Sequence, residues 1–124
     1  MRLNIELKKM QSQIHINVEL DEEKMPDSIH WSAPDGGVDN PQEAKAILLG
    51  LWDGQEKSAL RIDLWTKKMM VDEMNDLFYQ TFFGMADTYV RATKNSTLAE
   101  EIKSFAKTFH KKATEALEAS EKNS

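Results

Sequence analysis

Two long amphipathic segments at the C-terminal end of the chain restrict its fold more than any other feature. From Asp72 to Lys94, apolar residues recur at helical spacing in two adjacent rows. One row holds Met74, Phe78, Phe82, Met85 and Tyr89, and the other holds Tyr79, Phe83, Ala86 and Val90. Together they span an apolar arc of about 240°, well over the roughly 100° of a helix that is covered on one side. We therefore expect this helix to be covered on two sides, by another helix or by a second copy of the chain.

A final helix is expected to begin at Thr97, where Glu100 has capping-box spacing. It carries a narrower apolar stripe of Leu98, Ile102, Phe105, Phe109, Ala113 and Ala116. The connection between the two helices is only a few residues long, which makes them antiparallel neighbours.

The N-terminal half alternates between apolar and polar residues, which is typical of half-buried strands. Alternation predicts one strand over residues 14–20, a short one from Ile29 to Ala33 and another from Leu60 to Trp65. Between the second and third, Asn40-Pro41 followed by Glu43 matches a helix start. Ala44, Ile47, Leu48 and Leu51 continue at helical spacing up to Asp53-Gly54. The expected order is thus β-β-α-β-α-α, an α+β fold with a small antiparallel sheet of about three strands packed with a long C-terminal antiparallel helix hairpin.

The chain has 124 residues, enough to bury about two-thirds of its surface as one domain. We expect a single domain over residues 13–119. Residues 1–12 would form an N-terminal extension or an extra strand, since Leu3, Ile5 and Leu7 alternate, and residues 120–124 would be a frayed tail.

Composition argues against several functions. The chain has no cysteine, which excludes disulfides, thiolate nucleophiles and thiolate metal sites. Its net charge of -5 argues against binding to nucleic acid, which usually needs a basic face. No apolar run is long enough to insert into a membrane and no signal peptide is evident, so the expected location is the cytoplasm.

No catalytic motif stands out. The sequence lacks a phosphate-binding glycine loop, a serine-nucleophile elbow and helical histidine pairs. We therefore expect no enzyme activity, no catalytic residues, no cofactor and no metal. One alternative uses His15, His30 and Asp63, which share the polar phase of three predicted strands and would serve a small-ligand site or a minor enzyme.

Large aromatic residues provide the candidates for an interaction surface. They are Trp31, Trp52, Trp65, Tyr79 and Phe83. Tryptophan is common at binding surfaces. The favoured interpretation is nevertheless that the tryptophans complete the core where strands meet helices, and that Tyr79 and Phe83 pack on the last helix.

Several segments of the chain match the sequence pattern of a known family. They include Val18-Glu19-Leu20-Asp21-Glu22, Trp31 with Asp35-Gly36-Gly37, Glu43 to Ile47 with Trp52-Asp53, and Leu60-Arg61-Ile62-Asp63-Leu64-Trp65-Thr66-Lys67. The part from Leu60 to Thr66 is the most specific. Val71-Asp72-Glu73-Met74, Met85-Ala86-Asp87-Thr88 and Arg91-Ala92-Thr93 extend the likeness, which covers about residues 14–117. In these segments the chain resembles the gliding-motility-associated GldC family. The resemblance implies a small cytoplasmic accessory protein of bacterial gliding, without catalytic residues or a cofactor.

The leading hypothesis is a non-enzymatic interaction protein that supports gliding from the cytoplasmic side. Its partners would be proteins of the gliding apparatus or a second copy of the chain, with no nucleic acid and no membrane insertion. A chaperone-like clamp for exported proteins is a further alternative.

Overall fold

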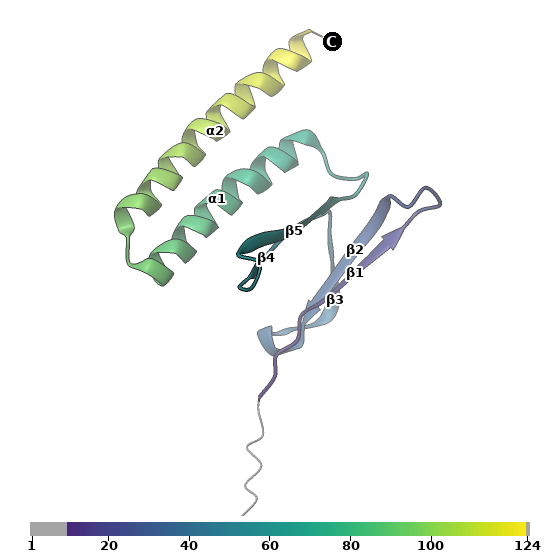
Figure 1. The fold of residues 1–124 in the computed structure, drawn as a ribbon. Helices are drawn as coiled ribbons and strands as arrows, with labels where there is room; N and C mark the ends of the chain where they lie inside the picture. The colour runs from purple at the N-terminus through teal and green to yellow at the C-terminus, as the bar shows by residue number, and fades with distance from the viewer. Residues whose placement is uncertain (1–9, 124) are drawn as a thin grey trace, which may run out of the picture. The chain divides into compact units, whose positions relative to one another are not determined.

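A computed structural model describes residues 10–123. The chain divides into two compact units, one ending at Lys68 and the other beginning at Met69. The first unit contains the strands and the second contains two helices (Figure 1). The expected α+β class with small antiparallel sheets and a long C-terminal helix is confirmed. The extra strand expected around Leu3, Ile5 and Leu7 lies outside the described residues, and the single domain over residues 13–119 stays a prediction.

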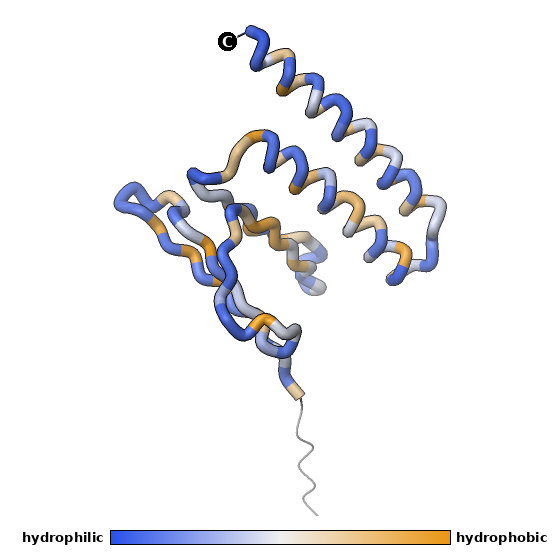
Figure 2. The backbone as a smooth tube through the Cα atoms, turned by 180° about the vertical axis from the view of Figure 1, so that it is seen from behind, coloured by the Kyte–Doolittle hydropathy of each residue, from blue (hydrophilic) through white to orange (hydrophobic). Residues whose placement is uncertain are grey.

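The first unit holds two antiparallel sheets. One has the order β1-β2-β3, with β1 at His15–Leu20, β2 at Pro26–Ala33 and β3 at Val38–Ala44. The other is the hairpin of β4 (Ala46–Asp53) and β5 (Ser58–Trp65), whose eight residue pairs follow one another without a register shift. Figure 2 shows many apolar residues gathered in this hairpin.

The helix expected over residues 40–53 is wrong, because this segment forms β3 and β4. Asn40 and Pro41 lie inside β3, near a register shift in its pairing with β2. An irregular edge strand accommodates proline, which cannot donate a backbone hydrogen bond. The apolar residues of β4 pair along their full length with β5, and this pairing prevails over their helical spacing. The described residues therefore contain five strands rather than about three.

The turns of the first unit are fixed by short-range hydrogen bonds. Asp21 closes the β1–β2 turn, since its Oδ1 accepts from the backbone N–H groups of Glu23 at 2.9 Å and Met25 at 3.0 Å. Its other oxygen pairs with Lys67 Nζ at 2.6 Å, which ties this turn to the end of β5. Pro34–Gly36 forms a short 3-10 helix, after which Gly37 adopts a φ of 84° that favours glycine.

The second unit is a helix hairpin of α1 (Val71–Thr93) and α2 (Ser96–Lys122), as expected. Lys94 ends α1 in the left-handed conformation, and the Asn95 side chain accepts the Leu98 N–H at 3.1 Å to begin α2. Asn95 therefore caps the helix where Thr97 was expected to do so. Helix α2 extends to Lys122, so residues 120–122 are assigned to the helix, and the frayed tail expected over residues 120–124 stays a prediction.

An aromatic cluster and small buried residues hold α1 against α2. Phe82 contacts two rings of α2, with centroid distances of 5.4 Å to Phe109 and 5.6 Å to Phe105. Ala86 on α1 and Ala99 and Ala106 on α2 are fully buried. Small side chains at such positions let two helices approach closely, so the hairpin is a packed unit.

Candidate functional site

The β4–β5 hairpin presents two different faces, because side chains alternate along each strand and paired residues share a face. One face, called here the aliphatic face, carries only aliphatic side chains in its central rows: Ile47, Leu49, Leu51, Leu60, Ile62 and Leu64. The opposite face, called here the tryptophan face, carries Trp52, Arg61, Asp63 and Trp65. The segment Leu60–Trp65 therefore contributes side chains to both faces.

The tryptophan face is open to solvent. Trp52 is 69% exposed and Trp65 is 58% exposed, and they lie near opposite ends of the hairpin. Between them, the Arg61 guanidinium donates to both carboxylate oxygens of Asp63, at 2.8 and 2.9 Å. A side chain at Gly50 would meet Arg61 Nη1 at 3.0 Å, so the absence of one leaves room for the guanidinium beside the strand.

Arg61 and Asp63 shift each other's pKa. The Arg61 guanidinium holds the pKa of the Asp63 carboxyl below its ordinary value, chiefly through the hydrogen bonds, and Asp63 in turn raises the pKa of Arg61. Both side chains are thus charged at neutral pH. An anionic carboxylate that accepts two such bonds is suited to binding and poorly suited to general acid chemistry.

A second feature of the first unit is an apolar cleft of about 320 Å³. Its lining comes from both sheets and contains no charged residue: Ile14, Ile16, Ile29, Trp31, Ala44, Ala46, Ile47, Leu48 and Leu49. This lining can hold apolar groups but supplies no acid, base or nucleophile.

His15, His30 and Asp63, the residues of the alternative ligand site or minor enzyme, are divided between two sheets. His15 and His30 lie on the same face of the β1-β2-β3 sheet, as their register requires. Asp63 belongs to the hairpin and is held by Arg61. Among residues 10–123, no group of three or more histidine or acidic side chains could hold a metal ion.

The five aromatic candidates lie in three places. Trp31 lines the apolar cleft, and Trp52 and Trp65 share the tryptophan face. Tyr79 and Phe83 pack toward α2, where the Tyr79 ring lies 4.4 Å from His110 and Lys103 Nζ lies 5.9 Å from the Phe83 ring. The aliphatic face was not predicted from the sequence, because its β4 residues were assigned to a helix.

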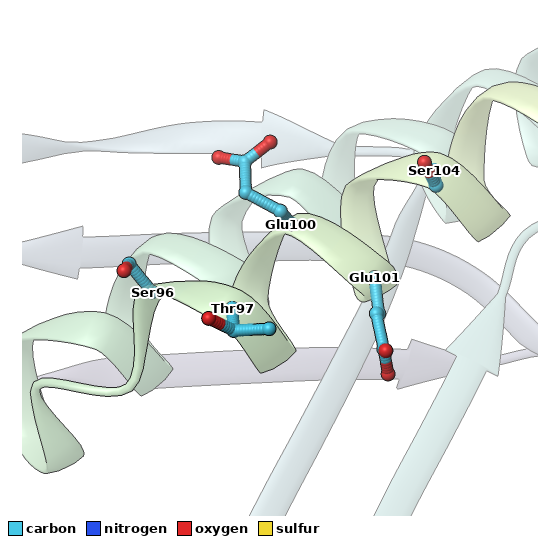
Figure 3. A pocket seen from close by; sticks show the side chains of 5 residues that line it. All are labelled: Ser96, Thr97, Glu100, Glu101 and Ser104. Carbon is cyan, nitrogen blue, oxygen red and sulfur yellow. The ribbon is translucent and has the colours of Figure 1, made fainter.

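A shallow depression over the first turns of α2 is lined by Ser96, Thr97, Glu100, Glu101 and Ser104. All five side chains leave the same helix, and Glu100 and Glu101 point to different sides of it (Figure 3). The depression therefore has no opposing wall that could enclose a ligand.

In the described part of the chain, no helix is long and apolar enough to cross a membrane.

Comparison with known proteins assigns the chain to a family. No curated protein and no solved structure matches the chain. A family model described as gliding motility-associated protein GldC-like matches residues 26–115, which is well over half of the chain and includes both Leu60–Trp65 and α1. The chain therefore belongs to the GldC-like family of gliding motility-associated proteins.

Proposed function

We propose that the chain is a non-enzymatic accessory protein of gliding motility that acts in the cytoplasm by binding a partner protein. The observation that carries this proposal is the family match over residues 26–115, which associates the chain with gliding. The exposed tryptophan face supports the binding role, because tryptophan and arginine are enriched where proteins bind one another.

The tryptophan face supplies the features of a protein-binding site. Trp52 and Trp65 offer large apolar rings, and the Arg61–Asp63 pair between them offers charged donors and acceptors. A partner that covers this face would bury both rings and a charged centre, which gives affinity from the rings and orientation from the charges.

The proposal is tested by replacing both tryptophans with serine in a gliding bacterium and measuring colony spreading and captured partners. We expect spreading to fall and one dedicated partner to be lost from the captured material. The control is Met85→Ser, which removes a side chain of similar exposure (55%) from α1 and should change neither.

Two results would contradict the proposal. Unchanged spreading after deletion of the whole gene would separate the chain from gliding. If the wild type binds any unfolded polypeptide equally well and the double tryptophan variant does not, the result would instead favour the chaperone-like clamp.

A further inference from the structure

Strand β5 has one edge with which no other strand of the described residues pairs. In the part of the chain that the structure describes, its sheet contains only β4 and β5, so β5 has a neighbouring strand on one side. Just after β5, the backbone N–H of Thr66 donates to the backbone oxygen of Lys45 at 2.8 Å. Backbone groups of successive residues in a strand point to opposite sides. The even-numbered residues therefore direct their N–H and C=O groups toward β4, and Ala59, Arg61, Asp63 and Trp65 direct theirs toward the open edge.

The side chains at this edge are also incompletely covered. Leu60 is 52% exposed and Ile62 is 51% exposed, and both belong to the aliphatic face. A two-stranded hairpin is marginally stable in water on its own, and an open apolar edge is a template for another strand. Both the backbone and the side chains of β5 are thus suited to strand pairing.

We propose that β5 pairs with β5 of a second copy of the chain, antiparallel, about a two-fold axis at Ile62. In this register Arg61 lies opposite Asp63 of the second copy, and Ala59 lies opposite its Trp65. All four residues have backbone groups directed toward the open edge, so each opposed pair exchanges two N–H···O bonds. The pairing does not rest on the motility role proposed above.

Charge selects this register over its neighbours. Centring the pairing on Arg61 or on Asp63 sets two like charges directly opposite each other, which is unfavourable across strands. When the axis lies at Leu60 or Leu64, only two of the four outward-directed residues face a residue of the second β5, and the other two lie opposite residues outside that strand. The register at Ile62 alone pairs all four and sets each arginine opposite an aspartate.

Pairing would also extend both faces of the hairpin. Each Asp63 already accepts two hydrogen bonds from its own Arg61 and would gain the arginine of the second copy as a further neighbour. The two aliphatic faces would become one surface on a four-stranded sheet, since both present Leu60, Ile62 and Leu64 on the same side.

The first test measures the mass of the intact protein by sedimentation over a range of concentrations. We expect the wild-type mass to rise toward that of two chains. Arg61→Asp and Asp63→Arg each place like charges at the axis, and each should weaken the dimer about tenfold or more. The double variant with both changes should dimerise like the wild type, because the charges are again complementary.

A mixture of the two single variants should form a dimer, since each supplies the charges that the other lacks. Lys107→Asp on α2 is the control for a change of the same charge and should dimerise like the wild type. A protein that stays monomeric at every concentration overturns the proposal, and so does a dimer that persists unchanged in both single variants. Circular dichroism of each variant shows that it is folded.

The second test uses cysteine, which the chain lacks. The Ile62 pair at the axis is a non-hydrogen-bonded pair, whose Cα atoms lie about 4.5 Å apart, within the range for a disulfide. Oxidation should therefore link Ile62→Cys chains into dimers. Leu60→Cys has nearly the same exposure but lies about 13 Å from its own copy at 3.3 Å per residue, so it should stay unlinked. Equal linking of both variants, or linking of Leu60→Cys alone, overturns the register.

Discussion

The aromatic contacts between α1 and α2 predict a large loss of stability when Phe82 is replaced by alanine. The Phe82 ring meets Phe78 of its own helix edge to face at 6.0 Å, and meets Phe105 and Phe109 of α2 at 5.6 and 5.4 Å. Each such pair contributes about 0.5–1.5 kcal/mol beyond area burial. With the apolar area also lost, Phe82→Ala should cost about 3 kcal/mol, the lower end for truncating phenylalanine, because the ring is only half-buried.

Phe83→Ala is the matched control. It makes the same chemical change at the next position of the same half-buried helix segment, so the change in helix propensity cancels. Among the described residues, the Phe83 ring has one ring neighbour, Tyr79 at 5.1 Å on its own helix, and it meets α2 through Lys103 Nζ, 5.9 Å from the ring. Phe82 loses two cross-helix ring pairs, whereas Phe83 loses one contact with a lysine, worth about 0.5–1 kcal/mol, so replacing Phe82 should be costlier by about 1 kcal/mol.

The assay is urea unfolding of the full chain, followed by circular dichroism at 222 nm. This signal reports the helices, which in the described residues are α1, α2 and one short 3-10 turn. If Phe83→Ala costs as much as Phe82→Ala, the cross-helix rings do not hold the hairpin together and the reasoning fails.

Three further predictions concern single hydrogen bonds and are checked by the same unfolding assay. Asn95→Ala removes the acceptor for the Leu98 N–H and should cost about 1 kcal/mol; a neutral result would show that the cap is dispensable. Thr66→Val removes a buried hydroxyl that bonds a backbone oxygen at 3.1 Å and should also cost about 1 kcal/mol, whereas a gain would contradict that role. The hydrogen bond from Lys67 holds the pKa of Asp21 below its ordinary value of 3.8. The stability that Asp21 contributes is therefore complete above that value and is lost as the pH falls through the lower pKa of the folded state. The difference between the wild type and Asp21→Asn should be constant at neutral pH and shrink below pH 3.8; a constant difference down to strong acid would contradict it.

The helices could be predicted from the sequence because their signal is long and redundant. Over more than 20 residues, two apolar rows at helical spacing leave no competing interpretation, and α1 begins and ends within one residue of the expected bounds. The strands around Ile29 and Leu60 were predictable for a similar reason, since strict alternation has a different period.

The segment around β4 could not be assigned from its own residues. Ala46 to Leu49 is a continuous apolar run, which is consistent with a helix or with a strand covered on both sides. The decision lies with β5, because the residues that pair with Ala46–Leu49 lie 13 to 19 positions further along the chain and supply the hydrogen bonds of this part of β4. Asn40 and Pro41 added a misleading local signal, because the same pair that starts a helix is accommodated in an edge strand near a register shift.

The candidate site shows the same dependence on distant pairing. Trp52 and Trp65 were recognisable as candidates, but their common face follows from the register that sets Trp65 opposite Ala46 and Trp52 opposite Ala59. Tyr79 and Phe83 were expected on the last helix, and their contacts with His110 and Lys103 agree with that expectation.

The strand conformation of residues 46–53 determines what the hairpin can bind. In a helix, Ile47, Leu48 and Leu51 would form one stripe and Trp52 would lie beside it. In β4, alternation separates them, so Ile47, Leu49 and Leu51 join the aliphatic face while Trp52 joins Arg61 and Asp63 on the other. Because both faces and the open edge share one pair of strands, a partner on the tryptophan face and a second copy at the edge would contact the same ion pair. The Arg61–Asp63 pair is therefore the point at which binding of a partner and self-association would influence each other, and charge reversal there should affect both.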